Sequence, residues 1–92
     1  MPNPELNAYR KDLADIALAG RVIASHYAKP LDRTVTHSAI LRVGPADRAD
    51  SIRELLSGEP FALLDDSLGW AWGYAGKDRR VGYVRSEAIG AP

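Results

Sequence analysis

Cysteine is absent from this chain of 92 residues, and histidine occurs only twice, as His26 and His37. The absence of cysteine excludes disulfides, thiolate metal ligands and a cysteine nucleophile together. The two histidines have no third ligand at metal-binding spacing, so ordinary surface or core roles are favoured for both. We therefore expect no metal and no cofactor.

An excess of charge of one sign is also missing, because 12 basic side chains balance 12 acidic ones and neither kind forms a long block. Nucleic-acid binding, which depends on clustered positive charge, is disfavoured. No apolar run approaches the roughly 20 residues of a membrane helix, and residues 1–5 do not resemble a secretory signal. We expect a cytoplasmic protein without nucleic-acid or membrane partners, or a cell-envelope protein if the chain is a processed fragment.

The length allows one domain with one modest core, and residues 1–30 differ in character from the rest. This first segment is predicted to be an arm, made of a short helix or an irregular stretch followed by an extended segment. Residues 22–27 have the composition of a strand, and the arm is expected to end at Pro30, because the residue before a proline avoids helix. A helical spacing of three or four residues joins Leu6, Tyr9, Leu13, Ile16 and Ala17.

Residues 31–92 have the composition and the residue pattern of a β domain. Strands are predicted at 34–37, 39–43, 61–64, 70–74 and 80–84, separated by glycine, proline and aspartate. A polar loop covers 44–50, a capping-box pattern at 51–54 leaves room for one helical turn, and turns are predicted at 57–60 and 65–67. About five short strands favour an all-β fold, and a small barrel is preferred because closure leaves fewer exposed edges.

The segment from Leu68 to Val84 contains both tryptophans and has the clearest strand pattern. Large residues at 70, 72 and 74 alternate with Ala71, Gly73 and Ala75, so one face is bulky and the other nearly bare. A turn at 76–79 then leads into a second strand, which predicts a hairpin. The bare face indicates that another segment approaches closely there, or that glycine permits strong twist.

The aromatic row, defined as Trp70, Trp72 and Tyr74, allows two interpretations. Exposed, it would be a recognition platform, because aromatic side chains offer large contact area and are enriched in binding hot spots. Alternatively, residues 1–30 fold across the row and bury it. We favour burial, with one tryptophan edge at the surface, because so small a domain has few other large residues for a core.

Several charged positions are candidates for a site. Arg42, Arg48 and Arg53 flank the loop at 44–54, and their guanidinium groups suit a peptide carboxylate, although a solvated loop is favoured. Glu59 precedes a proline, where fixing the turn is favoured over a ligand contact. Asp65 and Asp66 are adjacent, and we interpret them as turn residues rather than paired catalytic carboxylates.

Over about residues 33–90, the chain resembles the bacterial SH3-like domain. Four segments occur in the order and spacing of that domain, namely ILRVGP (40–45), ELLSGEPF (54–61), GW (69–70) and VGYV (81–84). Together with the preceding arm, they are similar to the amino-terminal domain of NlpC/P60 cell-wall peptidases of the dipeptidyl-peptidase VI kind. The resemblance implies a small SH3-like barrel beside a domain that cuts γ-D-glutamyl links in peptidoglycan stem peptides with a cysteine paired to a histidine.

This chain has no cysteine and no room for that second domain, so no catalytic residue is carried over and the chain alone is not expected to be an enzyme. The favoured hypothesis is a non-catalytic domain that helps to form or guard the substrate groove of such a peptidase. The alternative is a free-standing module that binds a cell-wall peptide or protein. A small hydrolase is disfavoured, because no nucleophile is recognisable beside a base.

The partners implied are a carboxy-terminal peptidase domain outside this chain and a peptidoglycan stem peptide. The candidate ligand-binding residues are Trp70, Trp72, Tyr74, Tyr83, Arg42, Arg48 and Glu59.

Overall fold

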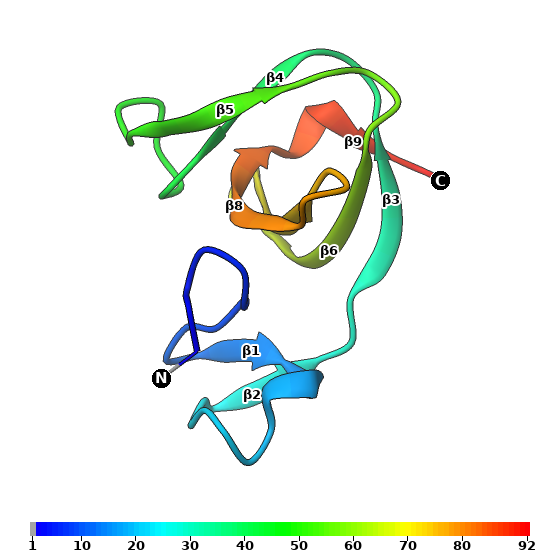
Figure 1. Cartoon of the computed structure of the whole chain (residues 1–92). Helices are drawn as coiled ribbons and strands as arrows, with labels where there is room; N and C mark the ends of the chain where they lie inside the picture. Colours follow the sequence, from blue (N-terminus) through cyan, green and yellow to red (C-terminus); the bar gives the residue numbers. More distant parts are fainter. Residues whose placement is uncertain (1) are drawn as a thin grey trace.

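The computed structural model describes residues 2–92, which form strands and two 3₁₀ turns and contain no α-helix. A rolled seven-stranded sheet forms the barrel, and a two-stranded sheet lies beside it (Figure 1). The expected all-β fold is therefore confirmed. The elements are β1 (Leu13–Asp15), η1 (Ile16–Leu18), β2 (His26–Ala28), β3 (Leu31–Val35), β4 (Ala39–Arg42), β5 (Ser51–Leu55), β6 (Pro60–Ser67), β7 (Trp70–Ala75), β8 (Arg80–Arg85), η2 (Ser86–Ala88) and β9 (Ile89–Gly90).

The strands of the large sheet follow the order β5-β4-β8-β7-β6-β3-β9, and each neighbouring pair is antiparallel. The register of the β4–β5 pair shifts between Leu41 and Arg42, where Ile52 of β5 is the extra residue, and that of the β6–β7 pair shifts at Leu64 of β6. Such irregularities bend strands and increase their twist, which lets a single sheet curl into a barrel. The predicted hairpin is confirmed as β7 and β8, joined by the turn at 76–79, with Trp72 directly opposite Tyr83.

Two local predictions were wrong. Residues 51–55 form the strand β5 rather than a helical turn, because pairing with β4 and burial of Leu55 outweigh the capping-box pattern. The turn predicted at 65–67 is the end of β6, and the chain reverses instead at Leu68 and Gly69. Both of these residues have positive φ, 53° and 83°, as in the two-residue type I′ turn whose twist matches the strands.

The arm adopts the irregular alternative, without an α-helix. Leu6 and Ile16 are 50% and 55% exposed, so the helical spacing does not create one buried face. The arm is held instead by parallel pairing of β1 with β2 and by local backbone bonds, such as that from the N–H of Asp15 to the carbonyl of Ala8 at 3.0 Å. The two-stranded sheet ends at Ala28, and the barrel begins at Leu31.

The nearly bare face of β7 points into the barrel. Ala71 and Ala75 are fully buried there, and a Cβ on Gly73 would overlap the carbonyl oxygen of Ala62 on β6. The expected close approach of another segment is therefore confirmed. Small residues on β7 leave room for the larger side chains of the core, which consists of Val35, Leu41, Leu55, Phe61, Ala71, Ala75, Val84 and Ala88.

The bulky face of β7 points outward, toward the arm. Trp72 and Tyr74 are only 3% and 4% exposed, because they form a second buried cluster with Ala8 of the arm, against which Leu13 also packs. Trp70 is 8% exposed and lies under the guanidinium of Arg85, 4.3 Å from the ring centroid. Burial of the aromatic row is thus confirmed, with the arm over two of its members and an arginine over the third.

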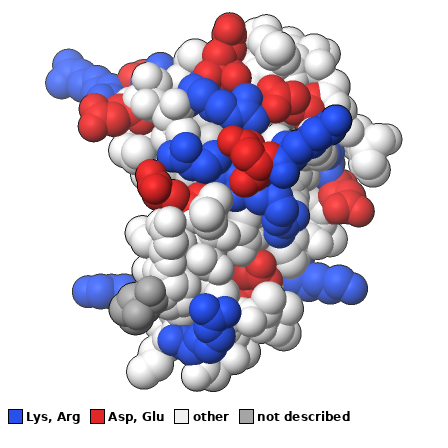
Figure 2. Space-filling view, in the orientation of Figure 1, with Lys and Arg blue, Asp and Glu red and all other residues white. Residues whose placement is uncertain are grey.

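Acidic and basic side chains lie side by side over the barrel on the face shown in Figure 2. Six ion pairs connect such side chains within residues 2–92. The face therefore has no extended area of one sign. No helical turn in this range is long and apolar enough to cross a membrane.

Candidate functional site

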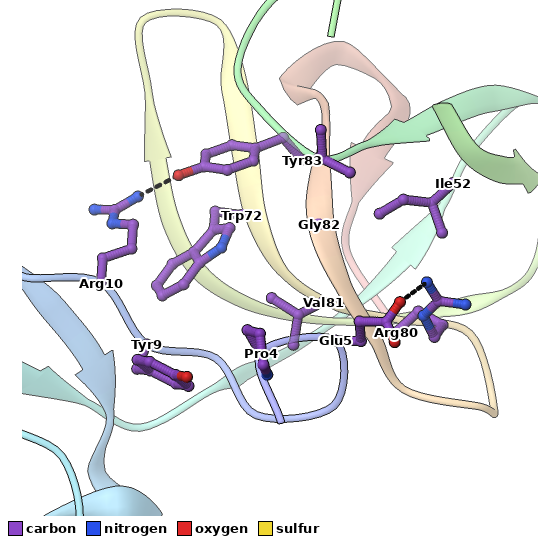
Figure 3. A pocket seen from close by; sticks show the side chains of 11 residues that line it. Pro4, Glu5, Tyr9, Arg10, Ile52, Trp72, Arg80, Val81, Gly82 and Tyr83 are labelled. Atoms are coloured by element: carbon purple, nitrogen blue, oxygen red, sulfur yellow. Dashed lines mark hydrogen bonds and ion pairs between the residues drawn. The ribbon is translucent and has the colours of Figure 1, made fainter. Parts of the chain in front are cut away.

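A cleft of about 380 Å³ lies where the arm meets the barrel, between the irregular segment before β1, the outer side of β8 and the facing ends of β4 and β5 (Figure 3). Apolar and aromatic side chains form most of its wall, and three charged groups lie at its margins. The cleft is lined by Pro4, Glu5, Tyr9, Arg10, Val43, Ile52, Trp72, Arg80, Val81, Gly82 and Tyr83.

Trp72 and Tyr83 form the aromatic part of the cleft. Because they are direct partners across β7 and β8, both side chains project from the outer face of the hairpin. Their ring centroids are 6.3 Å apart, and the ring planes are inclined by 30°. Trp72 is almost fully buried, so Tyr83, which is half-buried, offers the larger accessible aromatic surface.

Arg10 joins the arm to this aromatic pair. Its guanidinium lies over the Trp72 ring, 4.3 Å from the centroid, and its Nη1 donates to the Tyr83 hydroxyl at 3.3 Å. The other nitrogens bind the carboxylates of Asp12, at 2.8 and 2.9 Å, and Asp65, at 3.0 Å. Burial opposes the charge, but these hydrogen bonds outweigh it and raise the pKa of Arg10. Arg10 therefore stays charged and holds the cleft wall in place.

The opposite end of the cleft is polar. Nη2 of Arg80 lies 3.3 Å from Oε1 of Glu5, and the backbone N–H of Val81 donates to the Glu5 carbonyl at 2.8 Å. The Glu5 side chain is 65% exposed, so this ion pair is well solvated and weak. This end of the cleft thus offers a guanidinium and a carboxylate that are only loosely engaged with each other.

Of the seven candidate ligand-binding residues, only Trp72 and Tyr83 line the cleft. Tyr74 is turned into the junction with the arm, where its hydroxyl donates to Asp15 Oδ2 at 2.7 Å and accepts the N–H of Ala8 at 3.0 Å. Burial raises the pKa of this phenol. Trp70 lies under Arg85, outside the cleft.

The three charged candidates also lie elsewhere. Nη1 of Arg42 donates to the carbonyl of Ala49 at 2.9 Å, which closes the polar loop, and Arg48 is exposed on the same loop. Glu59 fixes its turn as expected: it accepts from Arg53 at 2.7 Å and from the backbone N–H of Leu56 at 2.7 Å. These two contacts hold the pKa of Glu59 below its ordinary value. A ligand-binding role for these residues remains a prediction.

No catalytic constellation is present in residues 2–92. That range contains no group of three or more histidine, cysteine, aspartate or glutamate side chains that could hold a metal. His26 and His37 are both exposed. Asp65 binds Arg10 and Asp66 accepts from the hydroxyl of Ser86, so the adjacent carboxylates serve different contacts.

The arm residues of the cleft were missed by sequence reasoning. Arg10 meets Asp65 and Tyr83 across separations of 55 and 73 residues, and no local pattern marks such contacts. One signal was available: Val43 and Ile52 are apolar residues on either side of the polar loop at 44–50, and both line the cleft.

Comparison with known proteins agrees with this architecture. A protein-family model described as the bacterial dipeptidyl-peptidase SH3 domain matches residues 41–89, which is more than half of the chain and includes β5 to η2. No curated protein and no solved structure matched the chain. With its rolled antiparallel sheet and the matching segment from Leu41 to Ile89, the chain belongs to the bacterial dipeptidyl-peptidase SH3 domain family.

Proposed function

We propose that this domain is a non-catalytic part of an NlpC/P60-type cysteine peptidase and helps to form or guard the groove for peptidoglycan stem peptides with γ-D-glutamyl links. The observation that carries the proposal is the cleft at the junction of arm and barrel, in a domain whose family is named for dipeptidyl-peptidases. The cleft has an aromatic wall for the body of a short peptide and loosely paired charges for its polar groups.

The arrangement favours a groove shared with another domain over an independent site. The cleft is small for a ligand-binding pocket, because about 380 Å³ lies near the lower end of the usual range. Its rigid wall, fixed by Arg10, would position a peptide without enclosing it. A facing peptidase domain would supply the opposite wall and the catalytic cysteine.

A titration with a peptide containing L-alanyl-γ-D-glutamate, followed by tryptophan fluorescence, tests the recognition step. We expect weak binding with a Kd of the order of millimolar, because only one wall is present. Trp72 lines the cleft and Trp70 does not, so W72F and W70F form a matched pair. The fluorescence change should persist in W70F and vanish in W72F. A change that survives in W72F would place the peptide elsewhere.

A second measurement addresses the peptidase partner. An NlpC/P60 peptidase domain deprived of its own SH3-like domain is assayed on the same peptide with and without the chain. We expect the chain to raise kcat/KM, and Y83F, which removes the hydroxyl bound by Arg10, to weaken that effect. Binding of the peptide without any effect on the peptidase would favour the alternative, a free-standing module that binds cell-wall peptides.

A further inference from the structure

A second hollow, of about 460 Å³, lies on the outer face of β3, β6 and β7, and it shares no lining residue with the cleft. We call it the basic hollow, because three cations line it: Arg33 from β3, and Lys77 and Arg79 from the turn between β7 and β8. Asp32 is the single acidic side chain among its lining residues.

The three cations of the basic hollow form no ion pair within residues 2–92, in contrast to four arginines elsewhere in the domain. The six ion pairs in that range engage Arg10, Arg53, Arg80 and Arg85. In a chain with 12 acidic and 12 basic side chains, three cations against the single carboxylate of Asp32 around one hollow are a local excess of positive charge. Such a cluster attracts an anion.

The position of the Arg79 side chain is suited to binding an anion. Its backbone is in the left-handed region, with φ of 53°, which is an uncommon conformation for a residue with a side chain. Its guanidinium lies over the Tyr74 ring, 4.2 Å from the centroid, and Tyr74 is itself fixed by Asp15 and Ala8. A stacked guanidinium keeps its N–H edge available for a carboxylate while losing little freedom on binding.

The rest of the hollow distinguishes between anions. Pro60 and Ala62 give it an apolar floor, which suits the methylene groups of a side chain. Asp32 repels a phosphate dianion more strongly than a carboxylate and can accept a hydrogen bond from a peptide N–H. We infer that the basic hollow binds a carboxylate side chain of an acidic peptide segment, with Arg79 as the principal contact and Lys77 and Arg33 in support.

The inference is tested by recording amide and indole NMR spectra of the chain during titration with N-acetyl-Glu-Glu-amide at low salt, with inorganic phosphate as the second arm. Shifts should concentrate at residues 32–34 and 76–79, and they should shrink as salt rises from about 50 to 200 mM. The indole signal of Trp72 should not move, because Trp72 lies in the other cleft. This readout separates the inference from the proposed function.

R79Q and R48Q form a matched pair, because each removes one exposed arginine that no ion pair within residues 2–92 engages. We expect R79Q to weaken peptide binding by about fivefold or more and R48Q by less than about twofold. K77Q provides a second test if R79Q alters the spectrum of the free protein. The inference would be overturned if R79Q and R48Q lost equal peptide affinity. It would also be overturned if phosphate bound more tightly than the peptide, or if the largest chemical-shift changes were centred on Trp72.

Discussion

Replacement of Tyr74 by phenylalanine removes one hydroxyl and tests how the arm is fastened to the barrel. The hydroxyl donates to Asp15 Oδ2 at 2.7 Å and accepts the N–H of Ala8 at 3.0 Å, and both partners are buried, at 5% and 0% exposure. Loss of a hydrogen bond to a carboxylate costs about 1.5–3 kcal/mol, and a buried N–H left without an acceptor costs about 1–3 kcal/mol.

The two costs are not expected to add in full, because the arm can open locally and let water reach the Asp15 carboxylate and the Ala8 N–H. Asp15 also keeps the bond that its Oδ1 accepts from the N–H of Ala17 at 3.0 Å. We therefore expect Y74F to lower the free energy of unfolding by about 2–4 kcal/mol. Urea unfolding followed by tryptophan fluorescence measures this change, because Trp70 and Trp72 lie on the same strand as Tyr74.

Y9F is the matched control. The Tyr9 hydroxyl donates to the Pro2 carbonyl at 2.8 Å in a partly buried contact, where water can replace it, so its removal should cost less than about 0.5 kcal/mol. Hydrogen exchange should show faster opening of the arm amides in Y74F, while the barrel amides keep their order of protection. If Y74F and Y9F unfold at the same urea concentration, the hydroxyl of Tyr74 does not fasten the arm.

The same variant has a pH signature. Burial raises the pKa of Tyr74 above the ordinary value of 10.0, so the neutral phenol is favoured in the folded state. This contribution to stability is complete below the pKa of the unfolded chain and is lost as pH rises through the higher folded pKa. The wild type should therefore lose stability above about pH 10 more steeply than Y74F. Parallel pH profiles for the two proteins would contradict the burial argument.

Three further substitutions probe single local features. L68N should raise the free energy of unfolding by about 0.5–1 kcal/mol, because Leu68 is 97% exposed at φ of 53°, which asparagine tolerates better; a loss of stability in urea would refute this. E59Q should cost about 1–2 kcal/mol at pH 7 by weakening the contact with Arg53. Because the folded pKa of Glu59 is lowered, its contribution is present above the unfolded pKa and lost as pH falls through the folded one, so unfolding curves of E59Q and wild type should converge in acid. G73A should cost about 2–3 kcal/mol, since its Cβ would overlap the carbonyl of Ala62, and an unchanged melting temperature would show that β6 yields easily.

The sequence was sufficient to predict the barrel, because its strongest signals are local. Alternation along residues 70–75 and the turn at 76–79 specify a hairpin from neighbouring residues alone. β5 was missed because Ser51–Leu55 is a largely polar edge strand whose local pattern fits a helix start equally well, and only its pairing with β4 decides the outcome. The turn at 68–69 was displaced because aspartates at 65 and 66 are common turn residues, whereas leucine at positive φ is not.

The site was less predictable than the fold. The burial of the aromatic row was foreseen from composition, because a small domain must use its largest side chains for packing. The sequence did not predict which arm residues contact the aromatic row. Arg10 and Tyr83, for example, are 73 residues apart and meet only after the sheet has rolled. Arg42 and Glu59 were selected only because they are charged. In the structure, Arg42 donates to the carbonyl of Ala49 and Glu59 accepts from the N–H of Leu56, so each binds the backbone of its own loop.

The seating of the arm on β7 also constrains the order in which the molecule can form. Residues 2–28 are synthesised before the barrel. The hydroxyl that binds Asp15 lies 59 residues later, and the backbone N–H that binds the Glu5 carbonyl belongs to Val81. The surface on which the arm packs therefore does not exist until the hairpin of β7 and β8 has formed. Contacts between residues so far apart in the sequence form slowly, so we expect docking of the arm to be the last step of folding. Until then, the apolar side chains of Ala8 and Leu13 stay exposed to solvent.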